Sequence, residues 1–162
     1  MIQKIGFGGG CHWCTEAIFQ SLIGITEVEQ GWIASTLPHA SSLSEAVIVH
    51  FDETSICQET LIEIHLLTHN ATSNHTFREK YRSAIYTFSD TQQKEAQTIL
   101  KQKASLFKKP LVTKVYPFGS FKRNKECYLN YYRNNPQKPF CQARIEPKLQ
   151  LLLEKFSTSI KN

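Results

Sequence analysis

Apolar residues along this chain follow two different periods, and their alternation predicts an ordered series of strands and helices. Short apolar runs and strict alternation indicate strands, whereas apolar residues three or four positions apart indicate one buried face of a helix. Ser89 and Gln92 form a capping-box pattern that marks the start of one helix. Gly31 is expected to mark a bulge in the second strand. The predicted strands cover residues 4–7, 26–34, 45–51 and 81–88 and a stretch after Pro110. The predicted helices cover residues 13–22, a stretch from residue 56, and residues 90–107, 126–133 and 147–156.

This alternation predicts an α/β or α+β fold, in which a mixed sheet and the helices packed on it form a two-layer sandwich. The 162 residues fit a single domain, residues 1–162, and 41% hydrophobic against 20% charged residues argue against disorder. Residues 116–143 are rich in aromatic, basic and proline residues. We therefore expect a long irregular segment toward the C-terminus, with only one short helix in it.

Charge and cysteine content narrow the class of protein. Nineteen Lys and Arg against fourteen Asp and Glu give a net charge of +5, but the basic residues are dispersed and accompany no nucleic-acid-binding motif. The first residues lack the apolar core of a signal peptide, and no apolar run approaches the roughly 20 residues of a membrane span. Five cysteines, an odd number, do not suggest a disulfide scaffold. We expect a cytoplasmic monomer that binds neither nucleic acid nor a membrane.

The segment Gly8-Gly9-Gly10-Cys11-His12-Trp13-Cys14 carries the strongest chemical signal. It places Cys11 where a strand ends and a helix begins, and the free N–H groups of a helix start can lower a thiol pKa well below its usual value of about 8.5. A buried structural cysteine, a redox dithiol and half of a zinc site are the other interpretations of this pattern. No second closely spaced Cys or His pair completes a zinc site, so we expect no metal.

Four segments of the chain carry a further signal when they are taken together. In chain order they are Gly9-Gly10-Cys11-His12-Trp13, Ser44-Glu45-Ala46-Val47, Tyr81-Arg82-Ser83-Ala84, and Tyr131-Tyr132-Arg133-Asn134-Asn135-Pro136 with Cys141 after it. Together these four segments resemble the type A peptide-methionine sulfoxide reductase family, and they span most of the chain. The resemblance implies a mixed sheet with packed helices, akin to a ferredoxin-like core.

The same resemblance implies an enzyme, a peptide-methionine (S)-S-oxide reductase. It would reduce the S epimer of methionine sulfoxide, free or in proteins, and so repair damage from oxidative stress. The Cys11 thiolate would attack the sulfoxide sulfur, release methionine and become a sulfenic acid. A second thiol would then form a disulfide that thioredoxin or a similar dithiol donor reduces. No metal or organic cofactor is implied.

The resemblance also gives roles to residues around Cys11. Glu45 would donate a proton to the sulfoxide oxygen, because a carboxyl group in a partly dry site stays protonated more easily. The Tyr81 hydroxyl would donate a hydrogen bond to the same oxygen. Trp13 and His12 would line the pocket for the methyl group, with His12 in the place where the family usually has phenylalanine. Without the resemblance, each of these residues reads as an ordinary strand-end or core residue.

Two features depart from the family pattern. The family usually carries an Asp a few residues before the tyrosine, where this chain has Thr76 next to His75. The segment between Gly31 and Ser44 lacks the second tyrosine that many members contribute. More of the recognition of the oxygen would therefore depend on Tyr81.

Two cysteines could resolve the sulfenic acid. Cys141 follows the Asn-Pro segment as the family's C-terminal resolving cysteine does, and a flexible loop could carry it to Cys11. Cys14 lies one helical turn from Cys11, at a separation compatible with a disulfide. We favour Cys141 and keep Cys14 as the alternative. Cys57 and Cys127 are expected to be structural.

Two other functions are compatible with parts of the sequence. A general thiol-disulfide oxidoreductase would use Cys11 and Cys14 and would not need Glu45 or Tyr81. A non-catalytic redox sensor would use the basic, aromatic C-terminal segment to bind partners, and it would be oxidised stoichiometrically without turnover.

Overall fold

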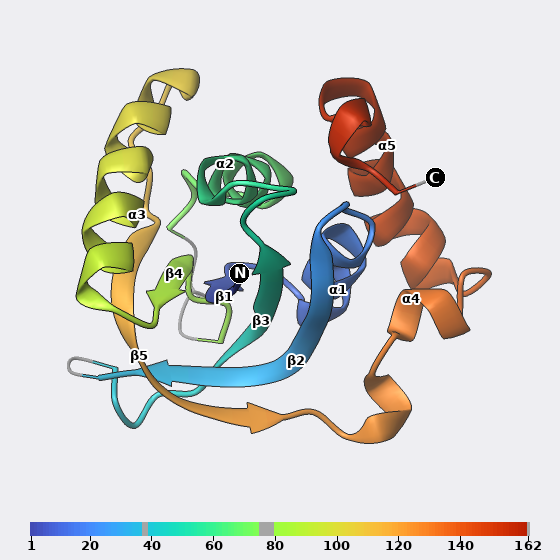
Figure 1. Ribbon diagram of the computed structural model, residues 1–162. Coiled ribbons are helices and arrows are strands. Elements are labelled where there is room, and N and C mark those ends of the chain that lie inside the picture. The colour runs from blue at the N-terminus through green and yellow to red at the C-terminus, as the bar shows by residue number, and fades with distance from the viewer. Residues whose placement is uncertain (37–38, 75–79, 162) are drawn as a thin grey trace.

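The computed structural model describes residues 1–36, 39–74 and 80–161 as a mixed α/β fold (Figure 1). The strands are β1 (Ile2–Gly8), β2 (Ile25–Ser35), β3 (Ser44–Asp52), β4 (Ala84–Thr87) and β5 (Lys114–Arg123). The helices are α1 (His12–Gln20), α2 (Gln58–Thr68), α3 (Asp90–Lys103), α4 (Tyr131–Asn134) and α5 (Glu146–Lys155), and short helical turns lie at Ala104–Leu106, Glu126–Tyr128, Cys141–Ile145 and Ser157–Ser159.

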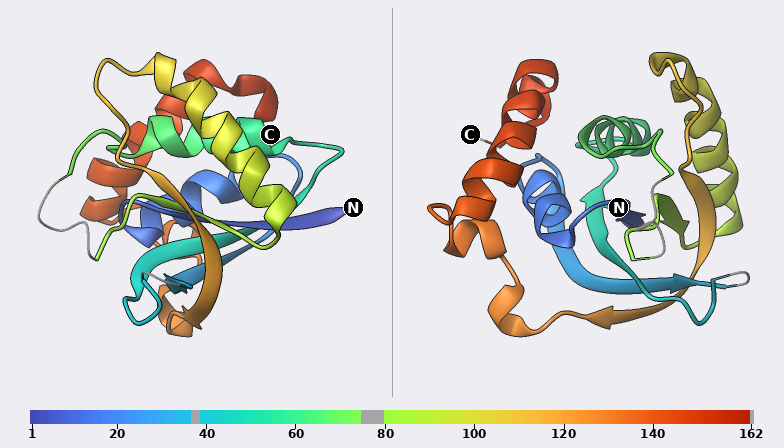
Figure 2. Two further views of the ribbon diagram at one scale, coloured as in Figure 1. Left: turned by 90° about the vertical axis from the view of Figure 1, so that its left-hand side faces the viewer. Right: turned by 180° about the vertical axis from the view of Figure 1, so that it is seen from behind.

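The strands form a closed barrel in the order β1-β3-β2-β5-β4, so the prediction of a ferredoxin-like two-layer sandwich is wrong. β1 pairs antiparallel with both β3 and β4, and β5 pairs antiparallel with β2 and parallel with β4. A sandwich sheet keeps two open edges, whereas this pairing satisfies both sides of each described strand. Figure 2 shows the curved sheet from two further sides, with helices packed outside it.

β5 lies later in the chain than the strand that was predicted after Pro110. It runs from Lys114 to Arg123, through part of the segment that was expected to be irregular. Pro117 and Gly119 make this stretch read as loop. The glycine is required, because a Cβ at Gly119 would lie 2.3 Å from the carbonyl oxygen of Ser35 on β2.

Gly31 also allows two strands to approach closely, and it does not mark the predicted bulge in β2. The bulges of β2 lie near Ile25 and Ser35 instead of at Gly31. A Cβ at Gly31 would lie 2.1 Å from the carbonyl oxygen of Lys122, so this glycine lets β5 approach β2 closely.

The two faces of β3 belong to different clusters of buried residues. Val47 and Val49 join the main core that also contains residues of α1 and α2, and Ala46 and Ile48 join a smaller cluster with Tyr86 of β4. Because side chains alternate along a strand, Glu45 lies on the same face as Val47 and Val49. β3 therefore presents Glu45 to the side of the barrel on which α1 lies.

The C-terminal segment packs against α1 (Figures 1 and 2). The buried Glu16 carboxylate on α1 accepts hydrogen bonds from the backbone N–H groups of Asn130 and Tyr131 at 3.0 and 3.1 Å. Asn130 has a φ of 55°, a left-handed conformation that asparagine tolerates. This contact fixes the start of α4 on the helix that begins beside Cys11.

Several predicted elements agree with the structure. β2, β3 and α5 lie within two residues of their predicted bounds, and the Ser89 hydroxyl accepts the Gln92 N–H at the start of α3 as the capping pattern predicts. The predicted strand at 81–88 is shorter, at residues 84–87. No helix among the described residues is both long and apolar enough to cross a membrane.

Candidate active site

Cys11 lies at the junction between β1 and α1, as the sequence predicts. It precedes the first residue of α1, and its carbonyl oxygen accepts the N–H groups of Cys14 and Thr15 at 3.1 and 3.2 Å. Gly9 has a φ of +147°, and a Cβ there would lie 2.5 Å from the ring of His69. A Cβ at Gly10 would meet nothing within 4 Å. The glycine turn thus directs the chain around the His69 ring and leaves open space beside Cys11.

The thiols of Cys11 and Cys14 form a hydrogen-bonded pair. This hydrogen bond raises the pKa of Cys11, and burial raises it further. The same hydrogen bond lowers the pKa of Cys14, because the Cys11 S–H donates to the Cys14 sulfur and stabilises its thiolate. The prediction that the helix start lowers the pKa of Cys11 is therefore wrong, because the hydrogen bond favours the thiolate of Cys14 over that of Cys11.

Two cations from the C-terminal segment act on Cys14, and sequence reasoning missed both. Lys148 and Arg144 favour the Cys14 thiolate, and Lys148 is itself held by the backbone carbonyl of Thr68. Burial lowers the pKa of Lys148, whereas the neighbouring thiols raise it. Arg144 and Lys148 lie four residues apart in the sequence, but nothing in the sequence placed this segment against α1.

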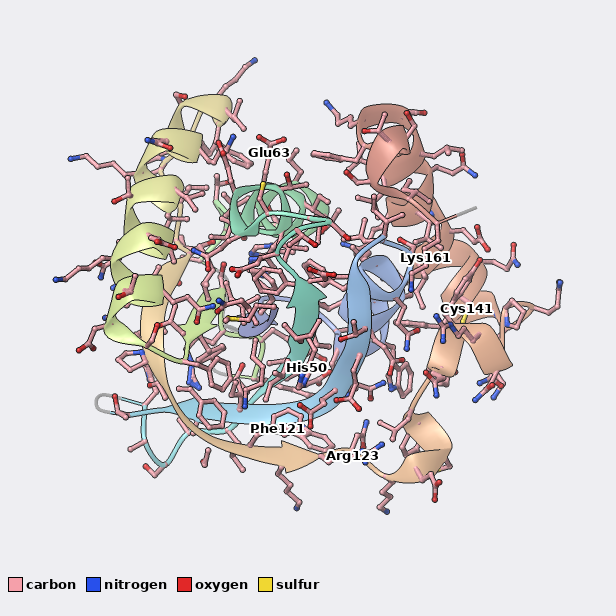
Figure 3. The ribbon with its side chains drawn as sticks, viewed as in Figure 1. His50, Glu63, Phe121, Arg123, Cys141 and Lys161 are labelled. Carbon is pink, nitrogen blue, oxygen red and sulfur yellow. The ribbon has the colours of Figure 1, made fainter. Side chains whose placement is uncertain are left out.

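Cys141 lies behind Cys14 in a buried apolar cluster. The cluster also contains Ala17, Tyr131 and Ile145, with Cys11 packed against it. Cys141 is fully buried, and burial raises the pKa of its thiol. Figure 3 shows it on the segment between α4 and α5. The predicted flexible loop is wrong, since Cys141 opens the helical turn Cys141–Ile145 that leads into α5.

Glu45 lies at the start of β3 with its carboxylate directed at the start of α1. Its Oε1 atom accepts the backbone N–H of His12 at 3.2 Å, and its Oε2 atom lies 3.6 Å from Lys80 Nζ. The residue is 6% exposed. Its charge also acts on Cys11, whose thiolate it disfavours.

The start of β3 also fixes the position of Tyr81. The carbonyl of Lys80 accepts the Glu45 N–H at 2.9 Å, and the Ser44 hydroxyl accepts the N–H of Arg82 at 2.7 Å. Tyr81 is therefore bracketed by two residues bonded to β3, and the structure brings it to the same end of β3 as Glu45. His75 and Thr76, the candidates for the missing Asp, lie outside the described residues.

His12 is buried, with only 4% of its surface exposed. Its Nδ1 atom lies 2.9 Å from the carbonyl oxygen of Gly31, and its Nε2 atom lies 3.3 Å from both Glu45 Oε1 and Asn124 Nδ2. Burial lowers the pKa of the ring, so His12 stays neutral to lower pH than an exposed histidine. Its nitrogens thus face protein groups, and little of the ring is available to a ligand.

Trp13 forms an aromatic wall with residues of the C-terminal segment. Its ring stacks on Tyr131 at 3.9 Å between centroids, and the rings of Tyr128 and Phe140 lie 5.6 and 5.4 Å away. The Trp13 indole N–H is buried without a hydrogen-bond partner among the described residues. Sequence reasoning found Trp13 but not its partners, which lie more than a hundred positions away.

The remaining cysteines lie elsewhere. Cys57 precedes the first residue of α2 and Cys127 lies in the helical turn Glu126–Tyr128, and both are exposed. The described site therefore combines two hydrogen-bonded thiols, a third thiol behind them, a buried carboxyl group and an aromatic wall. Such a set can attack a soft electrophile, protonate a leaving oxygen and form a disulfide.

Comparison with known proteins identifies related sequences over nearly the whole chain. A model of the peptide methionine sulfoxide reductase family matches residues 3–160. Peptide methionine sulfoxide reductase MsrA of Deinococcus radiodurans is 33% identical over 170 residues, which cover 96% of this chain and 82% of that protein. The protein of the same description from Trichodesmium erythraeum is 31% identical over 175 residues, which cover 99% of each chain.

Solved structures share the fold at lower identity. Mxr1 from Saccharomyces cerevisiae in reduced form has a TM-score of 0.75 and 20% identity, with coverage of 86% of this chain and 89% of that chain. Methionine sulfoxide reductase A of Corynebacterium diphtheriae has a TM-score of 0.74 and 22% identity, with coverage of 85% and 76%. Mxr1 in complex with Trx2 has a TM-score of 0.64 and 19% identity, with coverage of 77% and 82%.

Proposed function

Because the chain belongs to the peptide methionine sulfoxide reductase family, we propose that its Cys11 thiol reduces the S epimer of methionine sulfoxide, free or in proteins. The family reaction converts the sulfoxide to methionine. What is proposed for this chain is which residues perform each step. The observation that carries the proposal is the hydrogen-bonded pair of Cys11 and Cys14 at the start of α1, on the side of the barrel that Glu45 faces.

The first step is nucleophilic attack on the sulfoxide sulfur. The Cys11 proton passes along the hydrogen bond to Cys14, whose thiolate Lys148 and Arg144 stabilise. The Cys11 thiolate then attacks the sulfur and forms an S–S bond to it. The oxygen, protonated by Glu45, moves from the substrate sulfur to the Cys11 sulfur, so the S–O bond and the new S–S bond to the substrate sulfur both break. The products are methionine and a Cys11 sulfenic acid, so the substrate sulfur is reduced by two electrons and Cys11 is oxidised by two.

The departing oxygen needs a proton and a hydrogen bond. Glu45 is proposed to donate the proton, since its buried carboxyl group faces the start of α1. Tyr81 is proposed to donate the hydrogen bond, because the contacts of Ser44 and Glu45 hold it at the same end of β3.

The methyl group of the substrate is proposed to lie against Trp13. Tyr131 and Tyr128, stacked on the indole ring, and Phe140, perpendicular to it, keep the ring in place and make the surface apolar. His12 was expected to share this role, but its 4% exposure limits its contribution to the back of the pocket.

Recycling is proposed to begin at Cys14 instead of Cys141, which reverses our preference from the sequence. Cys14 is hydrogen-bonded to Cys11, so its thiol can displace water from the sulfenic acid and form the Cys11–Cys14 disulfide. Cys141, buried beside Cys14, is proposed to attack that disulfide in a second step and release Cys11. Mxr1 forms a complex with Trx2, and thioredoxin or a similar dithiol donor is the proposed reductant here.

The cellular location, domain number and oligomeric state of the enzyme are also proposals. An odd number of cysteines does not suggest a permanent disulfide scaffold, which supports the reducing environment of the cytoplasm. We propose a single domain over residues 1–162 that acts as a monomer, without nucleic acid and with no metal in its reaction.

Turnover of separate sulfoxide epimers tests this function. With dithiothreitol as reductant, the S epimer should be converted to methionine over many cycles and the R epimer should not. A small disulfide substrate provides the comparison, because a general thiol-disulfide oxidoreductase would exchange it quickly and reduce neither epimer. A redox sensor would be oxidised once and would not turn over.

A further inference from the structure

Three side chains that can ligate a metal ion lie together on β2 and β3, near the end of β3 that is far from Glu45. They are Glu27 and Glu29 on β2 and His50 on β3, which Figure 3 labels. Each offers one ligand atom, and the three atoms all lie within 4.8 Å of one another. His50 is about 16 Å from Glu45 along the strand at the usual rise per residue, so this cluster is separate from the candidate active site.

An irregularity in β2 places both glutamates on the same face as His50. Ile25 pairs with Phe51. An unbroken register would then pair Glu27 with Val49 and turn its side chain to the other face of the sheet. The register instead shifts between Ile25 and Glu27, and Glu27 pairs with His50. The second glutamate, two positions further along β2, keeps this face, so the bulge is what brings the three ligands together.

The His50 ring contacts both carboxylates through a single atom. Its Nε2 lies 2.6 Å from Glu29 Oε2 and 3.3 Å from Glu27 Oε2. Nε2 carries at most one hydrogen, and a carboxylate oxygen accepts, so this hydrogen serves the shorter contact with Glu29. The Glu27 carboxylate is left with a longer, shared contact. A cation in the place of the hydrogen can bind all three atoms at once.

The two carboxylates also repel each other, and no contact with a Lys or Arg relieves this repulsion in the described part of the chain. Neither Glu27 nor Glu29 has a Lys or Arg nitrogen within 4.0 Å there. Arg123 and Arg133 line a cavity of about 230 Å³ beside the glutamates, but both are exposed, so solvent and salt screen their charges. An added cation therefore has a repulsion to relieve.

The ligand types and their spacing select the kind of ion. In a tetrahedral site with bonds of about 2.0–2.1 Å, two ligand atoms lie about 3.3 Å apart. The contact between His50 and Glu27 has this length, and the contact with Glu29 must open by about 0.7 Å. An imidazole nitrogen suits Zn²⁺ and related transition ions, whereas Mg²⁺ and Ca²⁺ prefer oxygen ligands. Glu27 is exposed, so water can complete the coordination.

From this geometry we propose that Glu27, Glu29 and His50 form a binding site for one divalent transition ion of the Zn²⁺ class. An ion bound there joins β2 to β3 and stabilises the folded barrel by mass action. The site is independent of the proposed function, since it uses no residue of the candidate active site and adds no cofactor to the reaction. Its ligands come from two strands, with Glu29 and His50 21 positions apart, so closely spaced Cys and His pairs do not reveal it.

Binding of Co²⁺, a spectroscopic substitute for Zn²⁺, tests the site in the fully reduced protein. Equilibrium dialysis counts the ions bound to each chain. The cysteine thiols also attract such ions, but thiolate ligands give Co²⁺ an intense near-ultraviolet absorption that imidazole and carboxylate ligands lack. We expect one bound Co²⁺ per chain that does not contribute to this absorption.

His50→Gln and Glu29→Gln each remove one ligand, and Glu53→Gln, an exposed carboxylate just after β3, is the matched control. Each ligand variant should bind this ion about a hundredfold more weakly, because even groups behind metal ligands typically contribute tenfold to a hundredfold. The thiolate absorption should be the same in all the proteins, and circular dichroism checks that each is folded. Undiminished binding in both ligand variants, or thiolate absorption that accounts for every bound ion, overturns the proposal.

A measurement on the unaltered protein covers the case in which a variant does not fold. Paramagnetic Co²⁺ broadens the NMR signals of nuclei close to it. Broadening of the backbone N–H signals of Glu29 and His50 supports the proposed site. Broadening confined to the residues around Cys11 and Cys14 places the ion on the thiols and overturns it.

Discussion

The ring of Trp13 lies flat on the ring of Tyr131, with centroids 3.9 Å apart and planes 8° from parallel. Trp13 belongs to the first turn of α1 and Tyr131 to α4, so this contact joins the cysteine-bearing helix to the C-terminal segment. The same segment supplies Cys141, Arg144 and Lys148. One interface between distant parts of the chain therefore brings the third thiol and the two cations to the cysteines of α1.

Replacing Tyr131 by alanine should weaken this interface. Tyr131 is nearly buried, and removal of such a ring costs about 3 kcal/mol in the free energy of unfolding. KM for methionine sulfoxide should also rise, because Trp13 loses its stacking partner. Urea unfolding and steady-state kinetics check both effects. Tyr131→Phe is the matched control, which should retain both values, and an equal loss in Tyr131→Phe would assign the effect to the hydroxyl.

Glu45→Gln should slow the reductive step by about a hundredfold or more, since an amide cannot donate an acidic proton. Rapid-quench measurement of methionine formed in the first turnover reports this step alone. Glu53→Gln, an exposed carboxylate beyond the other end of β3, serves as control and should react normally. A first-turnover rate in Glu45→Gln equal to that of the control would leave the departing oxygen with another proton source.

Cys14→Ser should impair recycling by thioredoxin more than Cys141→Ser does. Cys14 forms the first disulfide in our account, whereas Cys141 acts after it. Cys127→Ser is the matched control, because Cys127 is exposed and outside the site. Peptide mapping after one turnover gives an independent answer. A Cys11–Cys141 disulfide, with normal cycling in Cys14→Ser, would restore the preference that the sequence suggested.

The lowered pKa of His12 predicts how stability depends on pH. The folded state binds fewer protons at His12 than the unfolded state does once pH falls below about 6.5. The free energy of unfolding should therefore fall as pH drops through about 6.5, until the folded-state pKa is passed. Urea unfolding between about pH 7.5 and 5.5 measures this change. His12→Gln should have a weaker dependence, and an identical slope in both proteins would refute the assignment.

Local patterns in the sequence were enough to place Cys11 and Glu45. A glycine turn between an apolar strand and an apolar helix face identified Cys11. A strongly apolar strand placed Glu45 at its start, and only the family resemblance gave Glu45 a role. Both signals lie within about ten residues, which is the range over which hydrophobic periodicity carries information. The structure brings the two residues to one end of the barrel.

The contacts that the sequence could not reveal join distant positions. Asn124 is 112 residues from His12 and 94 from Gln30, so no local pattern links them. Closure of the barrel was missed for a related reason, because β5 contains Pro117 and Gly119 and its pairing depends on the close approach that Gly31 and Gly119 permit. The pKa of Cys11 was misjudged because the hydrogen bond from Cys11 to Cys14 reverses the effect expected of a helix start.

A single-turnover reaction of the fully reduced protein with S-methionine sulfoxide, in the absence of any other reductant, tests the role of Cys11 most directly. Methionine and free thiols are counted together for the unaltered enzyme and for Cys11→Ser. With one equivalent of the sulfoxide, our account predicts one methionine per enzyme with the loss of two of the five thiols, and no methionine from Cys11→Ser, because a hydroxyl is a far poorer nucleophile toward sulfur. Stoichiometric methionine from Cys11→Ser would contradict it.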